Sequence, residues 1–238
     1  TLGDQANNPR INVRRADQAA IQDKMPRYAM LEDKDYGLLQ VTTRSGPAGQ
    51  TRVGITHFIM PSTTTAGSDK LVSQNNIRVP IDDYNCMFWR IRYNPDAPLG
   101  EKELWEAKHG GFLYPPLIPG TFTGVDNVHN DYNIDRVMQR NYNYSGIKSF
   151  STQDTALIED QRGPIMDRTH ERLVSSDEAI IRVRRHILKA ARDLQEGREP
   201  VAAAQAEGYA VKPLRFDIAP DASLEDAVAG RLAALGIK

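Results

Sequence analysis

Short strand-like runs, separated by turn residues, fill the first half of the chain, and no helical pattern lies between them. The runs are residues 28–32, 36–44, 51–60, 77–81 and 86–93. Turn-forming residues divide them, most clearly at 33–35 and 45–49, and a polar connection is predicted over 62–76. Because parallel strands need long crossovers, these closely spaced runs predict one antiparallel sheet over residues 27–93.

The strongest helical pattern comes later, over residues 177–196. Ser175 and Glu178 have the spacing of a capping box, and Gly197 and Pro200 supply the stop. An apolar stripe of period 3.6 runs along the helix through Ile180, Val183, Ile187, Ala190, Ala191 and Leu194. This order of elements predicts an α+β fold in which a curved antiparallel sheet packs on a long C-terminal helix.

The chain as a whole is predicted to form one domain over residues 1–238. It would have a polar lead-in at 1–24 and a long helix at 175–197. Residues 94–174 are predicted as loops and short helices, with helices over 99–107, from 154 or 155 to 161, and over 165–173. Gly163-Pro164 would end the second of these, and an aromatic, polar loop would continue through Tyr144. The tail at 198–238 should hold a final helix over 224–235, capped by Ser223.

Charge and composition exclude several classes of protein. The 238 residues carry a formal net charge of −1, so no bulk field attracts nucleic acid or an anionic membrane. No apolar run approaches the roughly 20 residues of a membrane span, and residues 1–30 show no signal-peptide pattern. A single cysteine, Cys86, excludes an intrachain disulfide and favours a reducing, cytoplasmic location.

Four segments of the second half carry a family resemblance. They are NDYNIDRVMQR at 130–140, SGIKSFSTQD at 145–154, GPIMDRTHE at 163–171 and SSDEAIIRVRRHILKAA at 175–191. Together they resemble the C-terminal signature of Rieske non-heme iron aromatic ring-hydroxylating oxygenase α subunits, in the phthalate and phenoxybenzoate dioxygenase branch. The resemblance implies a helix-grip domain, like those of START and Bet v 1 proteins.

The same resemblance implies a mononuclear Fe(II) site in which Asp154 is the carboxylate ligand. A two-histidine, one-carboxylate triad leaves positions free on the iron for oxygen and water. In the family the two histidines form a His-x3/4-His pair, whereas the closest histidines here, His170 and His186, are sixteen positions apart. Without the family motif, a helix cap or a surface residue is the plainer interpretation of Asp154.

A [2Fe–2S] Rieske cluster needs two cysteines and two histidines, and this chain has one cysteine. The histidine pair and the cluster are therefore expected before Thr1 or on another chain, and this chain alone is expected to be inactive. The intact enzyme implied by the family takes electrons from NADH through a reductase or ferredoxin and activates O2. It then oxidises an aromatic carboxylate or aryl ether by hydroxylation or O-demethylation, usually as a homotrimer.

The alternative is a non-catalytic helix-grip module that binds a hydrophobic ligand. In either function, the apolar face of the 86–93 run, with Met87, Trp89, Ile91 and Tyr93, is predicted to form core, the preferred interpretation, or the wall of a pocket. Ile147 and Phe150 are further candidates for a substrate pocket. His57 is predicted either to line a cavity or, the preferred interpretation, to be a hydrogen-bonded histidine of the sheet.

Charged residues near these candidates have plain interpretations. Arg52, Arg90 and Arg92 could anchor a carboxylate by paired hydrogen bonds, but a solvated sheet face is the preferred prediction. The acids near Asp154 are predicted to be helix-surface charges or caps; they are Glu159, Asp160 and Asp167.

Overall fold

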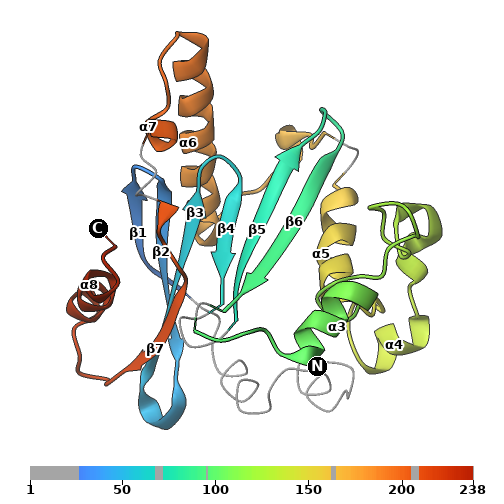
Figure 1. Cartoon of the computed structure of the whole chain (residues 1–238), viewed down its shortest axis with the longest axis horizontal. Helices are drawn as coiled ribbons and strands as arrows, with labels where there is room; N and C mark the ends of the chain where they lie inside the picture. Colours follow the sequence, from blue (N-terminus) through green and yellow to red (C-terminus); the bar gives the residue numbers. More distant parts are fainter. Residues whose placement is uncertain (1–26, 68–71, 95, 162–164, 205–208, 238) are drawn as a thin grey trace. The chain divides into compact units, whose positions relative to one another are not determined.

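The computed structural model of the chain describes residues 27–67, 72–94, 96–161, 165–204 and 209–237 (Figure 1). The chain folds into two compact units. The helical unit includes Pro98–Glu171, and the sheet unit includes Lys24–Ala97 and Arg172–Lys238. The predicted lead-in at 1–24 and the predicted stop at Gly163-Pro164 lie outside the described residues. Within the described part, no helix is both long enough and apolar enough to cross a membrane.

The sheet unit contains one seven-stranded sheet whose paired strands all run antiparallel, as predicted. Six strands follow one another in chain order, and the seventh pairs with β3 beside β4. They are β1 (Arg27–Lys34), β2 (Gly37–Ser45), β3 (Thr51–Ile59), β4 (Thr63–Ala66), β5 (Ser73–Pro80), β6 (Cys86–Tyr93) and β7 (Leu214–Ile218). The α+β fold with a curved antiparallel sheet and a long helix is thus confirmed.

Two parts of the sheet differ from the prediction. The polar connection predicted over 62–76 is wrong, because it contains β4 and the first half of β5. β7 was also missed, although it pairs with β3 from Thr51↔Ile218 to Ile55↔Leu214. In both places the pairing partner supplies the backbone hydrogen bonds, so a polar or short sequence still forms a strand.

Each face of the sheet carries its own apolar cluster. Leu39, Val41, Val53 and Ile55 pack with Leu214 of β7 and with Val228 and Leu232 of α8 (Leu224–Ala234). Leu38, Phe58 and Met60 pack on the other face with Ala179 of α6 (Glu178–Gln195) and Ala202 of α7 (Val201–Ala204). Since side chains alternate between faces along a strand, neighbours such as Leu38 and Leu39 enter different clusters.

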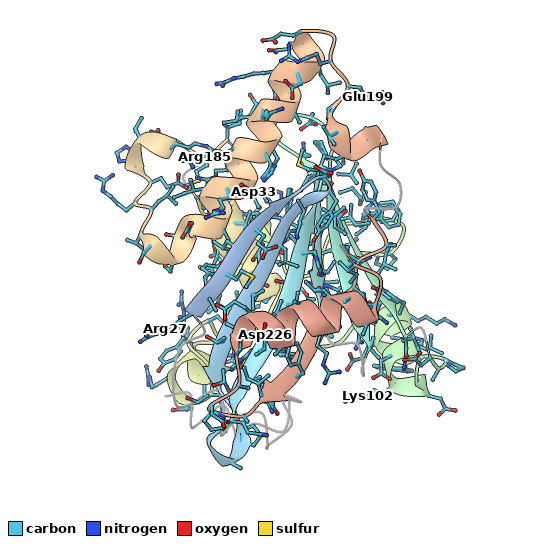
Figure 2. All side chains as sticks on the ribbon, turned by 90° about the vertical axis from the view of Figure 1, so that its left-hand side faces the viewer. Arg27, Asp33, Lys102, Arg185, Glu199 and Asp226 are labelled. Carbon is cyan, nitrogen blue, oxygen red and sulfur yellow. The ribbon has the colours of Figure 1, made fainter. Side chains whose placement is uncertain are left out.

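The long helix α6 lies over the β1–β2 end of the sheet. Figure 2 shows Asp33, at the end of β1, beside this helix, and its carboxylate lies 2.9 Å from Nε2 of His186. Arg182 of α6 donates to the Leu31 carbonyl oxygen of β1 at 3.0 Å. The predicted apolar stripe is only partly buried: Val183 and Ala190 pack on the core, while the side chains of Ile180, Ile187 and Leu194 are exposed.

The start of α6 also differs from the predicted capping box. A 3-10 turn, η4 (Ser175–Asp177), precedes the helix, and the Val174 N–H donates to the Asp177 carboxylate at 2.9 Å. Asp177 stands at the N-cap without a side-chain cap bond, so Ser175 is not the cap. At α8 the predicted cap is confirmed, because Ser223 Oγ accepts from the Asp226 N–H at 3.2 Å.

These two serines give a matched test of helix capping. We expect Ser223→Ala to lower the free energy of unfolding by about 1 kcal/mol, because it leaves an N–H at the start of α8 without its acceptor. Ser175→Ala should change it by less than about 0.5 kcal/mol. Urea denaturation of both variants measures the difference, and equal effects would contradict the two cap assignments.

The helical unit contains α3 (Glu101–His109), α4 (Arg136–Asn141), α5 (Phe150–Glu159), and the 3-10 segments η2 (Val128–Asn133) and η3 (Arg168–His170). The helix predicted over 99–107 is confirmed by α3. The loop predicted to run through Tyr144 is wrong at α4, where Asp135 Oδ1 accepts from the N–H groups of Val137 and Met138 at 2.9 Å. The helix predicted over 165–173 is also wrong, since its described residues form only the short turn η3.

Candidate functional site

The predicted iron ligand Asp154 lies in the middle of α5, not at its start. The helix begins at Phe150 because Ser149 is the N-cap, whose Oγ accepts from the Thr152 N–H at 3.4 Å. Neither a helix start at 154 nor the plain interpretation of Asp154 as an N-cap is therefore correct. A mid-helix carboxylate has no local backbone role, so its side chain is available for another partner.

Asp154 stands on an apolar side of α5. Residues three and four apart share a helix face, which places Phe150, Leu157 and Ile158 around Asp154. These three side chains are 46%, 72% and 58% exposed, and Asp154 is exposed as well. Among the described residues the Asp154 carboxylate has no hydrogen-bond or ion-pair partner. An unpaired carboxylate that shares a helix face with three apolar side chains is suited to bind a cation beside an apolar ligand.

The segment Phe112–Leu113 holds the first turn of α5. The Phe150 N–H donates to the Phe112 carbonyl oxygen at 2.9 Å, and Ser149 Oγ donates to the same oxygen at 3.2 Å. Ser151 Oγ donates to the Leu113 carbonyl oxygen at 2.5 Å. The rings of Phe150 and Phe112 lie 5.6 Å apart between centroids. These bonds explain why α5 can start among Ser and Thr residues that are typical of loops.

The residues just before α5 are buried. Ile147 is 3% exposed, and its carbonyl oxygen accepts from Asn143 Nδ2 at 3.2 Å and Gln153 Nε2 at 3.0 Å. Phe150, by contrast, is half exposed. Phe150 thus lies on the same helix face as Asp154, whereas Ile147 is packed inside the helical unit just before α5. The roles of both residues in a substrate pocket stay predictions.

Sequence reasoning missed a contact at the other end of α5. The Tyr132 hydroxyl, in η2, donates to the Glu159 carboxylate. Glu159 was predicted to be a surface charge or cap. Asp167, by contrast, does cap a turn, since its Oδ1 accepts from the Thr169 N–H at 2.9 Å. The Asn- and Asp-rich sequence around Tyr132 signals a tight turn, but nothing local points to Glu159.

The histidines are spread over five elements. His57 is in β3, His109 in α3, His129 in η2, His170 in η3 and His186 in α6. Within the described residues, no three His, Cys, Asp or Glu side chains gather into a group that could hold a metal ion. The described residues can thus supply one carboxylate ligand of an iron site, and they do not supply the other ligands.

His57 is a fully hydrogen-bonded histidine of the sheet unit. It is 1% exposed, its Nδ1 lies 2.8 Å from the Tyr36 hydroxyl, and its Nε2 lies 3.1 Å from the Lys212 carbonyl oxygen. Because a carbonyl oxygen only accepts, Nε2 carries the proton and Nδ1 accepts from Tyr36. Burial lowers the pKa of His57 from 6.5 to about 4, so the ring is neutral. Both nitrogens are already used, and a ligand would have to displace one of these partners.

The apolar face of β6 is not core within the described structure. β6 is an edge strand, and its Trp89 and Ile91 side chains are 52% and 47% exposed. The preferred prediction of core packing is therefore wrong for these two residues, because α6 covers the opposite end of the sheet. A pocket wall built on Met87 and Trp89 stays a prediction.

The three arginines predicted to be solvated have different environments. Arg52 forms a paired contact with Asp217 of β7, with Nε–Oδ1 at 2.9 Å and NH2–Oδ2 at 3.3 Å. It thus ties β7 to β3. Arg90 donates from Nε to Asn76 Oδ1 at 3.2 Å and lies over the Phe88 ring at 5.2 Å. Arg92 is half-buried on β6.

Comparison with known proteins places the chain in a family. The model for domains like the LigXa C-terminal domain matches residues 8–217. The chain belongs to this family. A curated relative, the oxygenase subunit of phthalate 4,5-dioxygenase from Pseudomonas putida, is 33% identical over 183 residues. Another, the oxygenase subunit of 3-chlorobenzoate-3,4-dioxygenase from Comamonas testosteroni, is 37% identical over 92 residues.

Membership of the LigXa C-terminal domain-like family confirms the resemblance to the C-terminal catalytic domain of Rieske oxygenase α subunits. The matched parts cover 75% and 38% of this chain. They cover only 41% and 21% of the two relatives, so the chain corresponds to less than half of either oxygenase subunit.

Proposed function

We propose that this catalytic domain acts within an intact oxygenase subunit that oxidises an aromatic carboxylate or aryl ether, with Asp154 as the carboxylate ligand of a mononuclear Fe(II). The supporting observation is the position of Asp154: among the described residues it is an unpaired carboxylate in the middle of a helix, on the face that carries the exposed apolar side chains of Phe150, Leu157 and Ile158. A solvated surface acid would normally stand among polar neighbours.

The iron, when bound, supplies the activation of O2. The two histidines of its triad would come from the part of the subunit outside this chain. Asp154 contributes a negative charge and one fixed ligand direction. The apolar side chains around it favour contact with an aromatic ring.

The wider assembly is proposed from the family resemblance and from the names of the relatives. Both relatives are named for dioxygenases of benzene carboxylates, which supports an aromatic acid as substrate. Electrons would reach the iron from NADH through a reductase or ferredoxin and a Rieske [2Fe–2S] cluster. The intact subunit would form a homotrimer in the cytoplasm, and the single cysteine of this chain is consistent with a reducing compartment.

Oxygen uptake by the intact subunit tests the proposal. With its reductase and NADH, the iron-loaded subunit should consume O2 and form an oxygenated product from at least one of phthalate, 3-chlorobenzoate and a methoxybenzoate. Iron content and product mass are measured together. A subunit that binds these acids but holds no mononuclear iron would contradict the proposal and favour the non-catalytic ligand-binding module.

A further inference from the structure

The loop that carries Tyr132 has an unusual backbone. Asp131, Tyr132 and Asn133 are consecutive and have φ values of 51°, 54° and 48°. This left-handed region is sterically costly for residues with a Cβ atom, and a bulky aromatic residue there is rare. Such conformations persist only where the surroundings impose them, and they gather at functional sites.

A dense set of hydrogen bonds imposes this conformation. Asn127 Oδ1 accepts from the His129 N–H, and the Asn127 N–H donates to Asn130 Oδ1, both at 2.9 Å. The Tyr132 N–H donates to the Asn127 carbonyl oxygen at 2.9 Å. Asn133 Nδ2 donates to Asp126 Oδ1 at 2.7 Å. The loop is therefore fixed from both sides of Tyr132.

The result is a buried tyrosine whose hydroxyl contacts α5. Tyr132 is 8% exposed, and its hydroxyl donates to Glu159 at the last position of the helix. Burial, followed by the hydrogen bond to the Glu159 carboxylate, raises the pKa of Tyr132 above its usual value of 10, so the hydroxyl keeps its proton. A phenol that donates to a carboxylate makes one of the stronger hydrogen bonds of a protein.

Glu159 is well placed to hold the helix without obstructing Asp154. The two residues are five positions apart, which separates them by roughly 140° around the helix axis. Tyr132 therefore binds α5 on a different face from the one that carries Asp154 and its apolar neighbours. The first turn is already fixed by Phe112–Leu113, so α5 is held at both ends.

We propose that Tyr132 and Glu159 are positioning residues that fix the direction of the Asp154 carboxylate through α5. This inference rests on the proposed function, because it assigns a purpose to the helix only if Asp154 binds the iron. Partners that orient a metal ligand typically change metal affinity by about 10- to 100-fold when they are removed. Since Tyr132 acts through a helix, we expect an effect at the low end of that range.

The test uses the intact oxygenase subunit and Fe(II) itself as the probe. Tyr132→Phe should weaken Fe(II) binding by about tenfold, and it should broaden the EPR spectrum of the ferrous–nitrosyl adduct as the carboxylate becomes less ordered. Glu159→Leu should have the same effect. Glu159→Gln keeps an oxygen acceptor for the Tyr132 hydroxyl and should restore most of the affinity.

Amide hydrogen exchange gives a readout without metal. In Tyr132→Phe, exchange should accelerate several-fold in the last turn of α5 and stay unchanged in α3. Tyr144→Phe is the matched control, because Tyr144 is exposed and its hydroxyl has no partner among the described residues. It should match the unchanged protein in both exchange and iron affinity.

The outcomes separate the inference from the proposed function. If Tyr132→Phe keeps the unchanged iron affinity and nitrosyl spectrum while Asp154→Ala loses iron, the positioning role is overturned. If Asp154→Ala keeps its mononuclear iron, the proposed function fails, whatever Tyr132 does. If Glu159→Gln is as impaired as Glu159→Leu, the contact does not act through the hydrogen bond and the inference is likewise overturned.

Discussion

Asp154→Ala in the intact oxygenase subunit should lose mononuclear iron while the protein stays folded. The substitution removes one of the three protein ligands of a facial triad. Loss of an outer-shell partner already weakens metal binding by about 10- to 100-fold, so loss of a direct ligand should exceed that. Because Asp154 is exposed and unpaired among the described residues, we expect the free energy of unfolding to change by less than about 0.5 kcal/mol.

The measurements are iron content, the EPR spectrum of the ferrous–nitrosyl adduct, and urea denaturation. Asp160→Ala is the matched control, since Asp160 is an exposed acid at the C-cap of the same helix. It should keep full iron content and full oxygen uptake. Equal iron content in the two variants would show that Asp154 is not a ligand of the metal.

The second large effect is a loss of stability in mild acid, caused by His57. In the folded chain the pKa of His57 is about 4, whereas the ordinary value is 6.5. Between these values the unfolded chain binds a proton that the folded chain does not. The stabilisation from the neutral ring is therefore complete above pH 6.5 and is lost as the pH falls towards 4. The loss should be about 1.4 kcal/mol per pH unit, or about 3 kcal/mol over the window.

The structural cause is the burial of His57 between Tyr36 and the Lys212 carbonyl oxygen. Protonation would place a charge at a site that is 1% exposed and whose two ring partners are a hydroxyl and a carbonyl oxygen rather than a carboxylate. The free energy of unfolding, measured by urea titration from about pH 7 to about pH 4, should fall more steeply than in His57→Gln. The glutamine amide can replace a hydrogen bond but does not titrate.

His129→Gln serves as the control, because His129 is exposed. The free energy of unfolding of this variant should vary with pH as it does in the unchanged chain. If His57→Gln shows the same slope as the unchanged chain, other groups cause the acid effect, and the neutral, buried state of His57 is wrong.

The sequence predicted the elements whose signals are local. β6 begins and ends where its alternating pattern does, and the cap of α8 is at Ser223 as expected. A strand of alternating side chains and a serine before an amphipathic run each reflect contacts among near neighbours. The motif that ends at Asp154 also lies within ten consecutive residues, at 145–154, but its role was implied by the family resemblance and not by a local pattern.

Contacts between elements decided what the sequence missed. β7 is a strand only because β3 offers its free edge to residues 214–218, more than 150 positions away. The polar residues of β4 and β5 pair with strands much nearer in the sequence, and they form strands because those neighbours supply the backbone hydrogen bonds. The stripe of α6 is buried only where the β1–β2 end of the sheet reaches it, so Ile180 and Leu194 remain exposed although their spacing is ideal.

The composition and the local patterns by themselves determined an antiparallel sheet and a long amphipathic helix, and the family resemblance of the sequence implied a candidate carboxylate. Only the tertiary structure set Asp154 in the middle of α5, engaged both nitrogens of His57, and directed Tyr132 at Glu159. Backbone preferences and side-chain periodicity are properties of neighbouring residues, and a sequence displays them directly. A hydrogen bond between residues 27 positions apart depends on how the intervening chain folds back, which no local pattern encodes.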